Sequence, residues 1–113
     1  MKQDCMESAG VRLVQGITAQ TGVVEEEVCA ALDWVETAMT MSRFNMYHQR
    51  GDALSHIRLA VSVPNADVPF SLRAHGFKAL PGKYQIDSML VAIRALLATP
   101  DLLGQHIDSL PMM

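Results

Sequence analysis

The sequence is poor in the residues that carry most protein chemistry. Its 113 residues include two cysteines, one tryptophan, two tyrosines and three phenylalanines. Cys5 and Cys29 are too few for a disulfide scaffold and do not form a C-x-x-C motif, so we expect both thiols to be reduced. The sparse aromatic residues indicate no platform on which nucleic-acid bases could stack.

Long apolar runs are also missing. The longest apolar stretches are interrupted by Asp33, Glu36, Arg94 and Asp101, and they fall well short of the roughly 18 residues that a membrane span needs. Residues 1–5 have neither the apolar core nor the cleavage site of a signal peptide. We therefore expect a cytoplasmic protein that has no membrane partner.

Motifs for catalysis, metal binding or nucleotide binding are absent from the sequence. His48 and His56 are not at the i, i+4 spacing of a helical metal pair, and His75 and His106 are isolated. There is no G-x-S-x-G elbow and no glycine run that could hold a phosphate. A nucleophile at Cys29 or at a histidine ranks last among our hypotheses. We predict no catalytic residue, no metal site, no cofactor and no enzymatic activity.

Apolar residues, by contrast, are abundant. Half of the residues are hydrophobic and 19% are charged, which predicts a packed core rather than disorder. The length leaves room for one domain, so we assign residues 1–113 to a single helical domain, with residues 1–4 and 111–113 flexible. A domain of this size buries its apolar surface incompletely, and an apolar excess favours burial against a second chain.

The spacing of apolar residues in the first half predicts two helices. Residues 6–20 have helical periodicity. The next segment places Glu25, Glu26 and Glu27 in a first turn, where carboxylates are stabilised by the helix dipole. No glycine or proline interrupts residues 23–50, which predicts one long central helix at 24–49. Cys29 lies on its apolar stripe, so we expect a small, buried side chain there.

The second half predicts two or three more helices, giving a mainly α fold of four or five. Residues 53–63 fit a helix or a strand, and Asp52 as an N-cap favours the helix. Prolines and glycines interrupt 64–83, so we predict a loop there, with 70–73 as a short strand. Any extended segment should fall within 57–80. Residues 85–98 form a helix buried on most sides, and Thr99-Pro100-Asp101 begins a short last helix.

The long helix carries large apolar side chains on more than one side. Phe44 and Tyr47 lie on a different side from Val35, so one small core cannot bury them all. Methionine, which occurs eight times, provides an adaptable apolar surface for binding. A well-filled core is the competing interpretation. We predict that the protein interface consists of Val35, Met39, Met41, Phe44, Tyr47, Phe70 and Leu72.

Charge is distributed unevenly along the chain. Residues 1–40 contain two basic and seven acidic residues, whereas residues 41–83 contain six basic and two acidic residues. A DNA-binding regulator that uses this basic centre is our second hypothesis. The net charge of −3 argues against a nucleic-acid partner. The residues of the basic centre are Arg43, Arg50, Arg58, Arg73, Lys78 and Lys83.

In its size, its expected cytoplasmic location and its lack of catalytic motifs, the chain resembles small bacterial quorum-sensing anti-activators of the QslA type. The resemblance implies a protein that binds a transcription factor and blocks its dimerisation. It covers no specific residues, so it assigns no binding position. Our main hypothesis is a non-enzymatic regulator, a homodimer formed through the apolar side of helix 24–49, which inhibits or sequesters a partner protein. Secretion chaperones and toxin-immunity proteins would share these features and remain alternatives.

Overall fold

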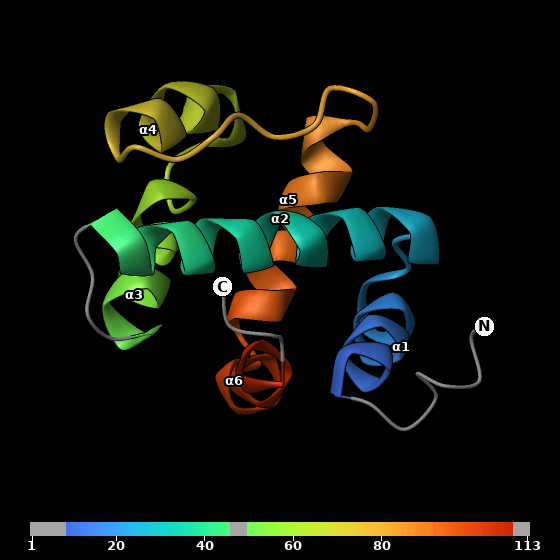
Figure 1. The fold of residues 1–113 in the computed structure, drawn as a ribbon. Helices are drawn as coiled ribbons and strands as arrows, with labels where there is room; N and C mark the ends of the chain where they lie inside the picture. The colour runs from blue at the N-terminus through green and yellow to red at the C-terminus, as the bar shows by residue number, and fades with distance from the viewer. Residues whose placement is uncertain (1–8, 46–49, 110–113) are drawn as a thin grey trace.

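The computed structural model describes residues 9–45 and 50–109, with the side chains of residues 9–39 and 53–109. These residues form six α-helices and a short 3-10 helix, and none of them lies in a strand, so the predicted mainly α class is confirmed (Figure 1). The six described α-helices are one more than the upper end of the predicted range of four to five. The elements are α1 (Ala9–Thr21), α2 (Glu25–Asn45), α3 (Arg50–Ala60), η2 (Asn65–Asp67), α4 (Val68–Ala74), α5 (Ile86–Leu97) and α6 (Pro100–Asp108).

Helix α5 forms the centre of the core. In Figure 1 it crosses behind α2, with α1 and α6 on one side of α2 and α4 on the other. Helix α2 packs against α5, α1 and α3, and α6 packs against α1 and α5. The broad apolar face predicted for residues 85–98 is thereby covered by several neighbours. The buried residues of α5 are Met89, Leu90, Ala92, Ile93, Ala95, Leu96 and Leu97.

Helix α2 corresponds to the predicted long helix and has 21 residues, up to Asn45, after which residues 46–49 are not described. Its first turn contains three glutamates, as predicted. Val28, Leu32 and Val35 are buried at three- and four-residue steps, which places this stripe against the core. Cys29 lies one position off the stripe and is exposed, so the predicted burial of its side chain is wrong. The apolar stripe therefore begins at Val28 and does not include Cys29.

The segment predicted as a loop contains a helix instead. Residues 68–74 form α4, so the short strand predicted at 70–73 is wrong. Pro69 lies in the first turn of α4, where a missing backbone N–H removes no helical hydrogen bond. Gly76 ends α4 with a positive φ of 82°, and the N–H of Phe77 donates to the carbonyl of Leu72 at 2.8 Å. This is the Schellman arrangement that terminates helices.

Two other predicted boundaries differ from the structure. Helix α3 begins at Arg50, so Asp52 lies within it and is not its N-cap. Thr99 precedes α6 as predicted, but its hydroxyl donates to the carbonyl of Ala95 at 3.0 Å instead of capping α6. Helix α1 spans Ala9–Thr21 and overlaps the predicted segment 6–20, of which residues 6–8 lie outside the described residues. The flexibility predicted for residues 1–4 and 111–113 concerns positions outside the described residues.

Candidate protein-binding surface

Helix α4 exposes a phenylalanine at the protein surface. Val68 and Leu72 are buried one turn apart, and Phe70 lies midway between them, on the opposite side of the helix. Its side chain is 70% exposed, against 61%, 58% and 44% for Val24, Leu59 and Val91, the other large exposed hydrophobic side chains among the described residues. The amphipathic pattern that anchors α4 therefore also directs the ring of Phe70 into solvent.

A mainly apolar hollow of about 250 Å³ lies next to this helix. Pro69 and Leu72, on either side of Phe70 in the sequence, form part of its wall. The rest of the lining comes from residues 79–86, which lie in the second half of the link from α4 to α5 and end at the first residue of α5 (Figure 1). The lining residues are Pro69, Leu72, Ala79, Leu80, Pro81, Gly82, Tyr84 and Ile86.

Three exposed cations lie along the same stretch of chain: Arg73, Lys78 and Lys83. The guanidinium carbon of Arg73 is 5.7 Å from the ring centroid of Phe70, and the ammonium of Lys83 is 5.5 Å from that of Tyr84. None of the three forms an ion pair with a carboxylate within the described part of the chain. We call Phe70, the hollow and these three cations the α4 surface. It combines an apolar centre with positive charge.

The described packing changes the interface predicted on the long helix. The side chains of Val35 and Met39 are 0% and 2% exposed, because the side of α2 that carries them faces the core. They present no surface to a partner, and the apolar side of α2 is buried in the core as far as its side chains are described, through Met39. Met41 and Phe44 lie on α2 beyond the described side chains, and Tyr47 lies outside the described residues.

The two predicted interface residues of α4 lie on different sides of that helix. Phe70 is exposed, whereas Leu72 is 1% exposed and belongs to the core while also lining the hollow. The prediction did not include Tyr84 and Ile86, which complete the hollow. Their contribution depends on how residues 77–85 fold back over α4, and no periodicity in the sequence marks that path.

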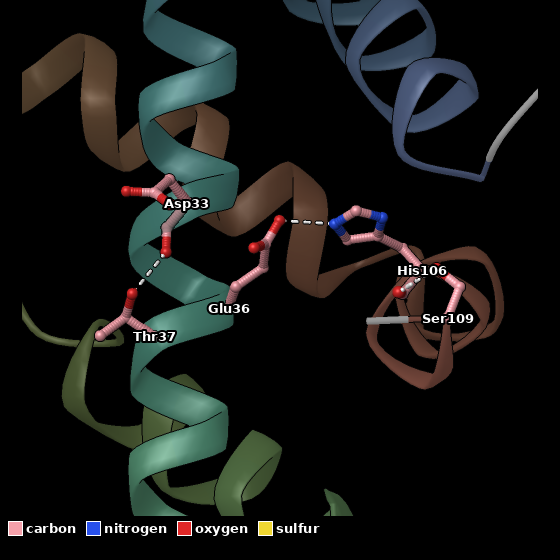
Figure 2. A network of polar contacts seen from close by, with 5 residues as sticks. All are labelled: Asp33, Glu36, Thr37, His106 and Ser109. Atoms are coloured by element: carbon pink, nitrogen blue, oxygen red, sulfur yellow. Dashed lines mark hydrogen bonds and ion pairs between the residues drawn. The ribbon is translucent and has the colours of Figure 1, made fainter. Parts of the chain in front are cut away.

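A second polar feature joins α6 to α2. The Nε2 atom of His106 lies 2.5 Å from Oε2 of Glu36, and the imidazole reaches from α6 toward α2 (Figure 2). Because a carboxylate only accepts hydrogen bonds, the ring nitrogen donates. The two side chains are 14% and 23% exposed. In α1, a Cβ added at Gly10 would lie 2.8 Å from the imidazole ring, so α1, α2 and α6 meet at this point.

The other described histidines also join helices. The rings of His56 and His75 are 6.0 Å apart, edge to face, and Nδ1 of His75 is 3.0 Å from the carbonyl oxygen of Ser71. They connect α3 to the end of α4, a contact that the sequence, in which His75 is isolated, does not predict. Across the described part of the chain, no three His, Cys, Asp or Glu residues are grouped so that they could hold a metal ion.

Arg58, from the predicted basic centre, forms a hydrogen bond within the fold. Its guanidinium donates to the carbonyl of Leu97 at 2.7 Å, near the end of α5. Arg94 donates to the carbonyls of Val61 and Val63, with distances from 2.6 to 3.1 Å. Both cations therefore donate to carbonyl groups at or beyond helix ends, since Leu97 is the last residue of α5, and Val61 and Val63 lie in the link after α3. Arg73, Lys78 and Lys83, the cations of the α4 surface, have no such carbonyl partner among the described residues.

In comparisons with known proteins, no family model matches the chain, and neither a curated protein nor a solved structure does. No helix within the described ranges is both long enough and apolar enough to cross a membrane.

Proposed function

We propose that this protein is a non-enzymatic regulator that binds another protein through the α4 surface. The observation that supports this most is the exposed ring of Phe70 beside an apolar hollow. Burying a phenylalanine side chain contributes about 1.5–3 kcal/mol, and exposed apolar patches mark interaction sites on small proteins. Aromatic anchors near pockets provide much of the binding energy in protein complexes.

The partner in this proposal is a regulatory protein such as a transcription factor, which the chain inhibits or sequesters. Its resemblance to small anti-activators in size and in lack of catalytic motifs supports this role. A secretion chaperone or a toxin-immunity protein would use an apolar surface of the same kind. The α4 surface favours any of these over a DNA-binding protein, because its centre is apolar and the chain has a net negative charge.

The proposal is tested by affinity capture from the source cell with three immobilised proteins: the wild type, Phe70→Ser and Leu59→Ser. Leu59 is the matched control, since it is also an exposed apolar side chain but lies on α3. We expect a protein that the wild type and Leu59→Ser retain and that Phe70→Ser loses. Its purified form should then bind the wild type more tightly than Phe70→Ser in a titration. Equal binding to all three proteins, or no specific capture by any, contradicts the proposal.

A further inference from the structure

A second surface region of the chain is complementary to the α4 surface in charge and in apolar character. Val24 is 61% exposed, and it is followed by the three glutamates of the first turn of α2, of which Glu25 and Glu26 are exposed and Glu27 is half-buried. We call residues 24–27 the acidic edge. It presents an apolar side chain beside carboxylates, whereas the α4 surface presents an apolar hollow beside cations.

We propose that a second copy of this chain docks its acidic edge on the α4 surface, and that the contact is reciprocal. The inference rests on the proposed function, because it assigns self-association to the surface that binds the partner. A dimer of this kind covers Phe70, so dissociation releases the surface for the partner. This contact differs from the dimer predicted through the apolar side of helix 24–49, whose described side chains, up to Met39, face the core.

Reciprocity follows from the positions of the two regions. Tyr84, in the wall of the hollow, donates a hydrogen bond to Oε2 of Glu26 at 3.2 Å. The acidic edge and the α4 surface are therefore neighbours within one molecule. In Figure 1 the first turn of α2 and the start of α5 both lie toward the right-hand side of the molecule. A twofold axis between two adjacent patches of opposite charge pairs each patch with its complement, as a symmetric dimer interface requires.

Complementary charge favours a second copy of the chain as the occupant of the α4 surface. Arg73, Lys78 and Lys83 have no carboxylate partner among the described residues, and Glu25 has no cationic partner there. Opposite charges across an interface steer association and fix its register. The apolar contact of Val24 with the hollow adds burial that a purely ionic pairing lacks.

Sedimentation equilibrium of the full chain tests the inference over a range of protein and salt concentrations. We expect a monomer–dimer equilibrium whose Kd rises with salt, because salt screens exposed charges. Either Glu25→Lys or Lys78→Glu alone should raise Kd by about tenfold, since each converts attraction into repulsion at both symmetry-related contacts. The double variant has the wild-type net charge and should return Kd to within about twofold of the wild type.

Asp101→Lys is the matched control. Asp101 is an exposed carboxylate in the first turn of α6, so its reversal changes net charge and a helix N-terminus in the same way as Glu25→Lys. Kd should not change in this variant. Equal weakening by Asp101→Lys, or a double variant that remains as weak as the single ones, would overturn the inference.

Failure of this inference can be separated from failure of the proposed function. A wild-type chain that is monomeric at every concentration overturns the self-association, while the comparison of Phe70→Ser with Leu59→Ser still decides partner binding. If both proposals hold, Glu25→Lys should capture the partner at least as well as the wild type, because its α4 surface is uncovered more often. Weaker capture by Glu25→Lys than by Asp101→Lys contradicts competition between the second copy and the partner.

Discussion

His106 in α6 and Glu36 in α2 are 70 positions apart in the sequence and are joined by a half-buried hydrogen bond (Figure 2). The contact links the last described helix to the longest one. We predict that His106→Ala lowers the free energy of unfolding by about 1–3 kcal/mol, the usual effect of removing a hydrogen bond to a charged group. Urea unfolding followed by circular dichroism measures the loss. Gln105→Ala, at an exposed neighbouring position of α6, should change stability by less than about 0.5 kcal/mol, and equal losses would refute a specific role for the pair.

Two glycines of α1 provide a second prediction. A Cβ at Gly10 would lie 2.8 Å from the ring of His106, whereas a Cβ at Gly16 would have no such neighbour within 4 Å. Alanine is favoured over glycine within a helix by about 1 kcal/mol, so Gly16→Ala should stabilise the protein by roughly that amount. Gly10→Ala should instead destabilise it by about 1–2 kcal/mol, because the held imidazole must move.

The same clash predicts how Gly10→Ala and His106→Ala combine. Once the imidazole is removed, alanine at position 10 has space and its helix propensity should become favourable. Thermal unfolding of both single variants and the double variant should therefore give non-additive losses, with the double variant at least as stable as His106→Ala. Additive losses would show that Gly10 and His106 do not interact.

Arg94 supplies a further prediction. Its guanidinium donates to the carbonyls of Val61 and Val63 and to Oδ1 of Asn65, which fixes the link after α3 to α5. Arg94→Lys keeps the charge but loses the planar set of donors, and we expect a loss of about 1–3 kcal/mol in urea unfolding. Arg58→Lys is the control, because Arg58 makes one such bond, to Leu97. A smaller loss for Arg94→Lys than for Arg58→Lys would contradict this assignment.

Helices α5 and α2 could be predicted from the sequence because their signals are local. Residues 85–98 are apolar on most sides, and residues 23–50 lack glycine and proline. Periodicity gives the direction of a side chain but does not identify the element that covers it. Val35 and Met39 were assigned to an interface for this reason, although both belong to the core. The covering helix α5 lies about 50 residues further along the chain.

The candidate site was only partly predictable. The sequence predicts Phe70 as an interface residue, but the density of prolines and glycines in 64–83 predicts a loop. In the structure, Pro69 and Gly76 mark the beginning and end of a short helix rather than its absence. The contact between His106 and Glu36 left no signal in the sequence, since only tertiary packing brings positions so far apart together.

The two sides of α4 give the last prediction. Leu72 is 1% exposed and Phe70 is 70% exposed, so removal of the first side chain should mainly affect folding and removal of the second should mainly affect binding. Leu72→Ala should lower the free energy of unfolding by about 2–5 kcal/mol, because it leaves a cavity in the core. Phe70→Ser should change stability by less than about 0.5 kcal/mol and weaken association with the captured partner. Urea unfolding and a binding titration on both variants check this, and a strongly destabilised Phe70→Ser would mean that its ring serves the fold rather than a partner.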